Sequence, residues 1–97
     1  VGRKVLALFD RAAARDFADV FEMSDRYDRP TLYGLAHAQD AGVEPGALAE
    51  MIGYLERFAD ADLPTSGARV GALRSFFAEW ATTLRAAAGD AWSGEPG

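Results

Sequence analysis

The sequence predicts an all-α protein, a compact bundle of about five helices. Alanine, leucine and arginine dominate the 97 residues, β-branched residues are few, and the alternation typical of a strand never lasts more than a few positions. Apolar residues recur instead at intervals of three and four, the spacing of a helix with one buried face. Nearly half of the residues are apolar and about a quarter are charged, which is the composition of an ordinary folded domain.

The chain is long enough for one domain and too short for two. We expect the helical domain to occupy residues 1–89. Residues 90–97 end in Gly-Glu-Pro-Gly, and we expect this tail to be flexible unless Trp92 docks on the domain.

Two apolar stripes open the chain. The first lies in residues 1–14 and the second starts at Phe17 and runs to residue 27. Asp16 stands where an N-cap is expected, and Asp19 follows three positions later in the first helical turn. These features predict two helices.

No glycine or proline separates the two stripes, so one continuous helix over residues 4–27 is the alternative. Along such a helix Lys4 and Asp16 would lie about 18 Å apart, at ~1.5 Å per residue. A site that contains both residues therefore requires a bend within residues 13–15.

Three further helices are expected. Asp28-Arg29-Pro30 opens a helix over residues 30–40, which Gly42 ends in a left-handed conformation. Glu44-Pro45 opens the next, which stops near Asp60. After a loop at residues 63–67, in which Thr65 or Ser66 is available as a cap, the longest helix covers residues 68–88 and ends at Gly89. Its core-facing positions are Val70, Leu73, Phe77, Trp80 and Leu84.

Composition excludes several classes of function. There is no cysteine, so disulfides, thiolate metal sites and cysteine nucleophiles are absent. The net charge of −5 argues against the whole surface binding nucleic acid, and we expect no DNA partner. A local basic patch stays open as an alternative, since Arg3, Lys4, Arg11 and Arg15 gather near the N-terminus. No apolar run approaches the ~18 residues of a membrane span, and no leader resembles a signal peptide. We expect a cytoplasmic protein that does not bind a membrane.

The segment from Lys4 to Phe21 carries the chemistry of the chain. It reads Lys-x6-Arg-x3-Arg-Asp-Phe-x-Asp-x-aromatic, with Arg11 as the first arginine and Arg15-Asp16-Phe17 as the centre. This pattern resembles the late motifs of the AbiEii/AbiGii (Abi-type) toxin nucleotidyltransferases. The resemblance in specific motifs is confined to about the first 27 residues, and the remainder of the chain is compatible with the C-terminal helical region of that family.

The resemblance implies a role for each polar residue of the segment. Lys4 and Asp16 would be catalytic, Lys4 offsetting phosphate charge and Asp16 orienting the lysine or the acceptor hydroxyl. Arg11, Arg15 and Asp19 would bind substrate, the arginines through phosphate oxygens. The residues alone also permit a structural interpretation. Asp16 would cap the helix that includes Phe17, Asp19 would be the acidic residue of its first turn, and the arginines would form salt bridges with neighbouring aspartates.

The function that the resemblance implies is transfer of a nucleotide from an NTP, with Mg²⁺, onto an RNA acceptor such as the 3′ end of a tRNA. The family belongs to type IV toxin–antitoxin systems, so an antitoxin protein is a further implied partner. The Gly-Ser turn and strand-borne Asp-x-Asp of the family's catalytic core do not occur here. We therefore expect the chain alone to bind no metal or NTP cofactor and to be inactive.

Other chemically suggestive residues have simpler interpretations. Asp60-Ala61-Asp62 is literally Asp-x-Asp, but it follows a helix and lacks the rigid strand that fixes a metal pair. His37 is the only histidine, and we expect it to face solvent or to be half-buried. Phe76, Phe77 and Trp80 are expected in the core, not in a platform for stacking bases.

Two other functions compete with the nucleotidyltransferase. A non-enzymatic helical module that binds other proteins would suit the acidic charge and the seam around Trp80. A DNA-binding helix-turn-helix is the weaker alternative, since no helix after the first has a concentrated basic face.

Overall fold

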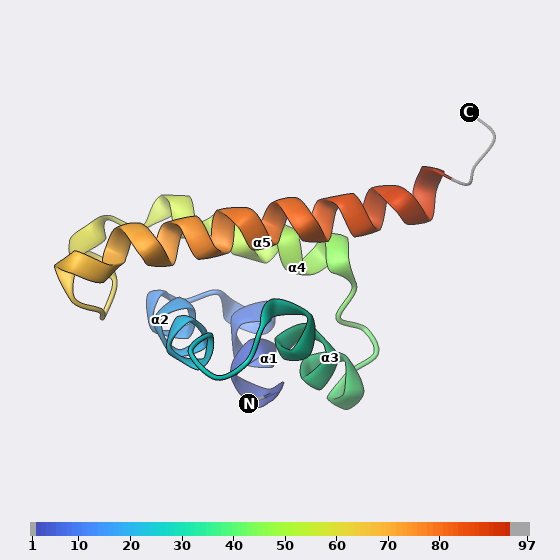
Figure 1. Cartoon of the computed structure of the whole chain (residues 1–97), viewed down its shortest axis with the longest axis horizontal. Coiled ribbons are helices and arrows are strands. Elements are labelled where there is room, and N and C mark those ends of the chain that lie inside the picture. The colour runs from blue at the N-terminus through green and yellow to red at the C-terminus, as the bar shows by residue number, and fades with distance from the viewer. Residues whose placement is uncertain (1, 94–97) are drawn as a thin grey trace.

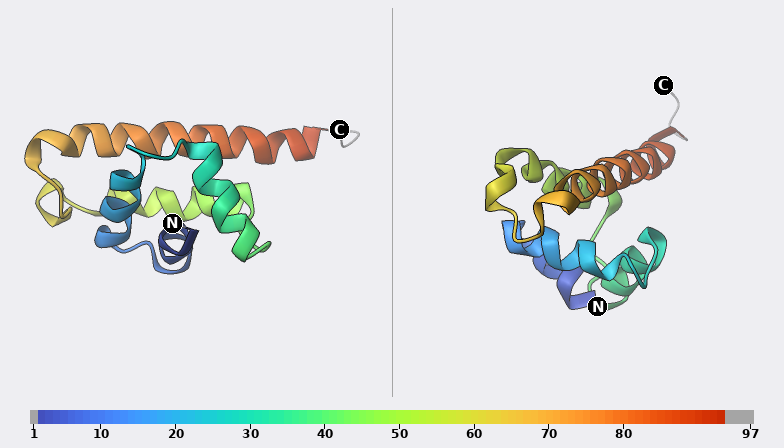
Figure 2. Two further views of the ribbon diagram at one scale, coloured as in Figure 1. Left: turned by 60° about the horizontal axis from the view of Figure 1, so that its bottom comes forward. Right: turned by 60° about the vertical axis from the view of Figure 1, so that its left-hand side comes forward.

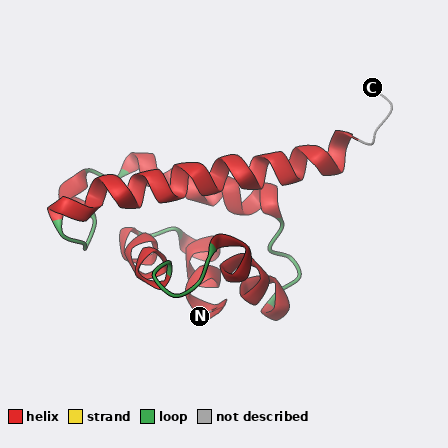
Figure 3. Ribbon diagram, in the orientation of Figure 1, coloured by secondary structure: helices red, strands yellow, loops and turns green. Residues whose placement is uncertain are grey.

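The all-α prediction is confirmed by the computed structural model, which describes residues 2–93. These residues form five α-helices: α1 (Gly2–Arg11), α2 (Ala14–Met23), α3 (Arg29–Gln39), α4 (Pro45–Gly53) and α5 (Gly67–Ser93). Two short 3₁₀ helices, η1 (Tyr54–Arg57) and η2 (Asp60–Asp62), lie between α4 and α5. Within this part of the chain every segment is helix or loop, and none is a strand (Figure 3).

The helices are arranged as a pair and a group of three. The helices α4 and α5 run side by side, and α1, α2 and α3 lie together on one side of this pair (Figures 1 and 2). Gly46 at the start of α4 faces Ala88 near the end of α5, whereas Arg74 of α5 contacts Leu55 and Phe58 beyond the end of α4. The pair is therefore antiparallel.

The core lies between these two groups. Phe17 of α2 packs edge-on against Phe77 of α5, with ring centroids 5.1 Å apart, and Trp80 follows on the same face of α5. Burial of these aromatic side chains holds α2 against the long helix, with ~3–5 kcal/mol expected for each large aromatic truncated to alanine. The five predicted core-facing positions of α5 are buried: Val70, Leu73, Phe77, Trp80 and Leu84.

Two helices start as the sequence predicts. Asp28 accepts a hydrogen bond from the Thr31 amide at 2.9 Å as the N-cap of α3, and Pro30 occupies its first turn. Glu44 is the N-cap residue of α4, with Pro45 as the first helical residue. Proline is tolerated at both places because the amides of a first turn have no helical partner.

Two predicted helix ends are wrong. Gly42 does not adopt a left-handed conformation: α3 ends at Gln39, and the Asp40 side chain turns the chain by accepting the Gly42 amide at 2.9 Å. Gly89 does not end α5, which continues to Ser93, because an isolated glycine weakens a helix by only about 1 kcal/mol. Residues 94–97 of the expected flexible tail, and the Trp92 side chain, lie outside the described residues.

The fourth helix is also shorter than predicted. It ends at Gly53, and the chain tightens into η1 before an extended Phe58. Arg74 donates hydrogen bonds to the carbonyl oxygens of Leu55 (3.4 Å) and Phe58 (2.6 Å). The Leu55 carbonyl also accepts the Phe58 amide at 3.1 Å, so Arg74 adds a second partner there and supplies a donor to the Phe58 carbonyl. An arginine from α5 thus stabilises the turn that follows α4, which the local sequence does not indicate.

Candidate phosphate-binding site at the α1–α2 corner

A sharp corner separates α1 from α2. The helix α1 ends at Arg11, Ala12 takes a left-handed conformation with φ 47°, Ala13 is extended, and α2 begins at Ala14. The predicted bend is therefore confirmed, one residue earlier than expected, and the single continuous helix is excluded. An alanine with positive φ costs about 1 kcal/mol, which burial of the Ala12 side chain helps to offset.

Asp16 lies inside this corner and is only 2% exposed. Its Oδ2 accepts hydrogen bonds from Arg11 Nε and from the Ala13 amide, both at 2.9 Å, and its Oδ1 accepts from Arg11 Nη2 at 2.8 Å. The hydrogen bonds from Arg11 lower the pKa of the Asp16 carboxyl; burial opposes this change, and the Ala13 amide adds to it. Asp16 is thus ionised at neutral pH and has its partners within the domain.

The expected role of Asp16 as an N-cap is wrong in detail. The N-cap residue is Ala13, and Asp16 is the third residue of α2. Alanine has no side-chain oxygen, so the amides at the start of α2 receive nothing from the N-cap side chain. Asp16 instead reaches back to the Ala13 amide, which is one half of a capping box.

Asp19 connects the two helices on the exposed side of the corner. Its Oδ2 lies 3.2 Å from Lys4 Nζ and 3.8 Å from Arg15 Nε, and the side chain is 30% exposed. One carboxylate therefore holds a lysine from α1 and an arginine from α2 close together. Exposed ion pairs of this kind contribute ~0–1 kcal/mol to stability, so their geometry is more informative than their energy.

The five site residues predicted from the sequence form two groups of ion pairs on α1 and α2. Arg11 pairs with Asp16, and Lys4 and Arg15 pair with Asp19. Lys4 and Asp16 do not contact each other among the described interactions, so Asp19 and not Asp16 is the carboxylate that orients Lys4. Lys4, Arg11 and Arg15 are 48%, 64% and 77% exposed at the side chain, which leaves them accessible to a ligand.

A shallow groove of about 650 Å³ begins at Lys4 and Asp19. It continues along α2 to Tyr27 and is closed by Arg69 of α5, which lies over the Phe21 ring at 4.7 Å. The other residues that line it are Glu22, Met23, Asp25 and Arg26. Asp19 and Glu22 lie three residues apart on α2 and so share one face of that helix, whereas Arg26 follows the end of α2. Nothing in the sequence brings Arg69 to this groove.

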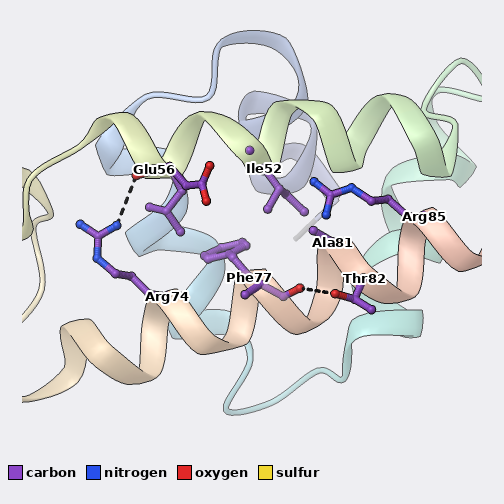
Figure 4. Close-up of a pocket in the computed structure, with 10 residues that line it drawn as sticks. Ile52, Glu56, Arg74, Phe77, Ala81, Thr82 and Arg85 are labelled. Atoms are coloured by element: carbon purple, nitrogen blue, oxygen red, sulfur yellow. Dashed lines mark hydrogen bonds between the residues drawn. The ribbon is translucent and has the colours of Figure 1, made fainter.

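A second groove of about 490 Å³ lies between α4 and α5, on the side away from α1 (Figure 4). Its floor is apolar, with Ile52, Phe77 and Ala81, and Glu56 and Arg85 stand at its rim. None of the five predicted site residues belongs to this groove.

The other residues considered from the sequence have structural surroundings. Asp60 pairs with Arg74 at 2.8 Å, and Asp62 accepts the Ala59 amide at 3.3 Å. His37 is exposed beside the Tyr33 ring. Phe77 and Trp80 are buried as predicted, while Phe76 is half-buried under the Arg29 guanidinium at 4.8 Å.

The family that the sequence resembles uses Mg²⁺, and the residues present do not fit that ion. Among the side chains that the structure describes, no three carboxylate or imidazole groups come together in a group able to hold a metal. At the corner both carboxylates face cationic side chains. The described part of the corner therefore offers exposed cationic side chains and no group of metal ligands.

No helix in the described part of the chain has the length and apolarity needed to cross a membrane. Comparison of the chain with protein-family models, with curated proteins and with solved structures gives no match.

Proposed function

We propose that this chain is the C-terminal helical part of an AbiEii/AbiGii-type toxin nucleotidyltransferase. Such an enzyme transfers a nucleotide from an NTP onto an RNA acceptor that resembles tRNA. The observation that carries the proposal is the α1–α2 corner, where Lys4, Arg11 and Arg15 from two helices converge around two aspartates. Three exposed cations on these two neighbouring helices supply positive charge of the kind that binds a triphosphate or an RNA backbone.

Each residue then has a definite task. Lys4, a compact ammonium group at the end of an exposed side chain, offsets negative charge on a phosphate during transfer. Asp19 keeps Lys4 and Arg15 together in the absence of ligand. Asp16 serves the site through Arg11 and through the geometry of the corner, because its oxygens face Arg11 and the Ala13 amide.

Mg²⁺ and the turn that binds the NTP phosphates belong, under this proposal, to the family's catalytic core, whose Gly-Ser and strand-borne Asp-x-Asp this chain lacks. When bound, Mg²⁺ supplies charge to the transferred phosphoryl group. The proposal also places the protein in the cytoplasm, with an antitoxin as a further partner.

The decisive experiment uses the complete enzyme that contains this chain. Lys4→Ala should reduce transfer of labelled nucleotide to tRNA by ~100-fold or more and abolish toxicity, because one fixed charge that acts in the transition state has an effect of that size. Asp60→Ala and Asp62→Ala, which change the literal Asp-x-Asp, should leave transfer unchanged. Full activity of the Lys4→Ala enzyme would refute the proposal.

The isolated 97-residue chain should not label tRNA with any NTP and Mg²⁺, because its described residues include no group of metal ligands. Labelling by the purified chain would show that the metal site lies within it and would overturn this assignment.

A helical module that binds other proteins is the second candidate. The Trp80 side chain is 1% exposed, so the seam that favoured this function in the sequence is buried and offers no contact surface. The observation that supports this function is instead the groove between α4 and α5. Tyr54, an exposed aromatic residue, lies in sequence between Gly53 and Leu55, which line that groove. An intact enzyme without nucleotidyl transfer activity would favour this alternative.

A further inference from the structure

Arg11 uses only one of the two edges of its guanidinium group within the domain. The inner edge, formed by Nε and Nη2, donates to the two oxygens of Asp16 at 2.9 and 2.8 Å. A guanidinium group has five N–H bonds in a rigid plane, and its outer edge, formed by Nη1 and Nη2, can grip a second anion in the same paired manner. No described residue accepts a hydrogen bond from Arg11 Nη1.

Asp16 determines where this outer edge points. Its carboxylate is 2% exposed and is fixed by the Ala13 amide at 2.9 Å, so it cannot follow a mobile arginine. Phe17, the next residue, is fully buried against Phe77 and fixes the start of α2. A paired hydrogen bond to a fixed carboxylate leaves a planar group little rotational freedom.

The Arg11 side chain nevertheless remains 64% exposed, so its outer edge is accessible from solvent. Lys4 and Arg15, which Asp19 holds together, lie on the neighbouring part of the same corner. The local surface therefore combines one oriented guanidinium group with two further cations.

We infer that Asp16 is a positioning residue, which holds Arg11 so that the outer edge of its guanidinium binds two oxygens of one phosphate group. The biological source of that phosphate, the triphosphate of an NTP or the backbone of RNA, rests on the proposed function. Phosphate binding by Arg11 is a property of the folded chain alone. It requires the guanidinium group of an arginine, because a lysine ammonium group carries the same charge without a second pair of N–H donors.

The test measures binding of two probes to the 97-residue chain by NMR of the arginine Nε–H groups: inorganic tripolyphosphate and a short single-stranded RNA. The Arg11 signal should shift with the probe that binds. Stronger binding of tripolyphosphate indicates a site for the nucleotide, and stronger binding of RNA indicates a site for the acceptor. If neither probe shifts the Arg11 signal, the inference is wrong.

Arg11→Lys keeps the charge but removes the outer edge, so binding should weaken by roughly threefold to tenfold. Arg57→Lys is the matched control, because Arg57 is an exposed arginine whose guanidinium lies over the Tyr54 ring and forms no described ion pair with Asp16 or Asp19; binding should not change. Equal binding by wild type and Arg11→Lys would overturn the inference.

Asp16→Asn tests the positioning role. If Asp16 acts through Arg11, Asp16→Asn should weaken binding in the wild-type background and have no further effect in the Arg11→Lys background. Each variant is measured at a temperature where circular dichroism shows it to be folded. Equal and additive effects in both backgrounds would show that Asp16 does not act through Arg11.

These results are separable from the proposed function. If tripolyphosphate binds at Arg11 and the complete enzyme transfers no nucleotide, the proposed function fails and the positioning role stands. If the complete enzyme is active but Arg11→Lys binds both probes as wild type does, the positioning role fails alone.

Discussion

Asp16→Asn is the perturbation that best separates the structural part of the corner from its chemistry. Asparagine keeps one side-chain oxygen, which can still accept the Ala13 amide at the start of α2. The other atom becomes an NH₂ group, which faces the donating N–H groups of Arg11 and finds no acceptor there.

The magnitude follows from burial. A buried polar group without a partner costs about 1–3 kcal/mol. The Arg11 head group can still be hydrated, but residue 16 is only 2% exposed, so the new NH₂ group of asparagine would not reach water. We expect a loss of about 2 kcal/mol in the free energy of unfolding. For a domain of this size such a loss lowers Tm by roughly 8–16 °C, at ~4–8 °C per kcal/mol.

Urea unfolding followed by far-UV circular dichroism measures this loss. The control is Asp19→Asn, which removes a carboxylate from the same corner but from a 30% exposed site with exposed partners, and which should cost only ~0–1 kcal/mol. The m-values of wild type and both variants should agree, so that differences in midpoint report stability alone. A free energy of unfolding for Asp16→Asn within about 0.5 kcal/mol of wild type would refute the conclusion that the buried carboxylate stabilises the corner.

The free energy of unfolding should depend on the ionisation of Asp16. The hydrogen bonds from Arg11 lower the pKa of Asp16 in the folded state. The carboxylate therefore stabilises the domain fully above the unfolded pKa of about 3.8, and this stabilisation is lost as the pH falls through the folded pKa. Unfolding measured from neutral pH down to pH ~2 should therefore show a steeper loss below pH ~4 for wild type than for Asp16→Asn, and parallel curves would contradict this. Gly2→Ala should destabilise the domain by ~1–3 kcal/mol in thermal unfolding, because the added Cβ would contact the Gln39 side chain and lie 2.7 Å from the Leu35 carbonyl oxygen in α3. Gly34→Ala, where a Cβ meets nothing within 4 Å, should instead stabilise α3 by ~0.5–1 kcal/mol, and similar effects of both substitutions would argue against a close approach of α1 and α3.

Regular apolar spacing made most of the fold predictable from the sequence. The five helices and their buried faces follow from three-and-four periodicity, and prolines mark the starts of α3 and α4. Helix ends were harder to predict than helix centres. After α4 the chain contacts Arg74 from α5 at the Leu55 and Phe58 carbonyls, and no pattern near Gly53 reveals this distant partner.

The candidate site was predictable as a set of residues but not as a set of contacts. The need to bring Lys4 near the aspartates predicted the bend, and the bend is present. Which cation meets which aspartate depends on the direction of α2 after the corner. That direction is set by a left-handed alanine, a residue that carries no sequence signal for such a turn.

Ala12 gives the corner an unusual dependence on the rest of the molecule. Alanine prefers a right-handed helix, so a peptide limited to residues 2–23 would favour one straight rod, with Lys4 and Asp16 about 18 Å apart at ~1.5 Å per residue. Contacts from α3, α4 and α5 to α1 and α2 keep the chain folded back on itself. The arrangement of Lys4, Arg11 and Arg15 thus depends on the complete tertiary structure. Substitutions that unfold α5 would separate these three cations, although α1 and α2 could still form as helices.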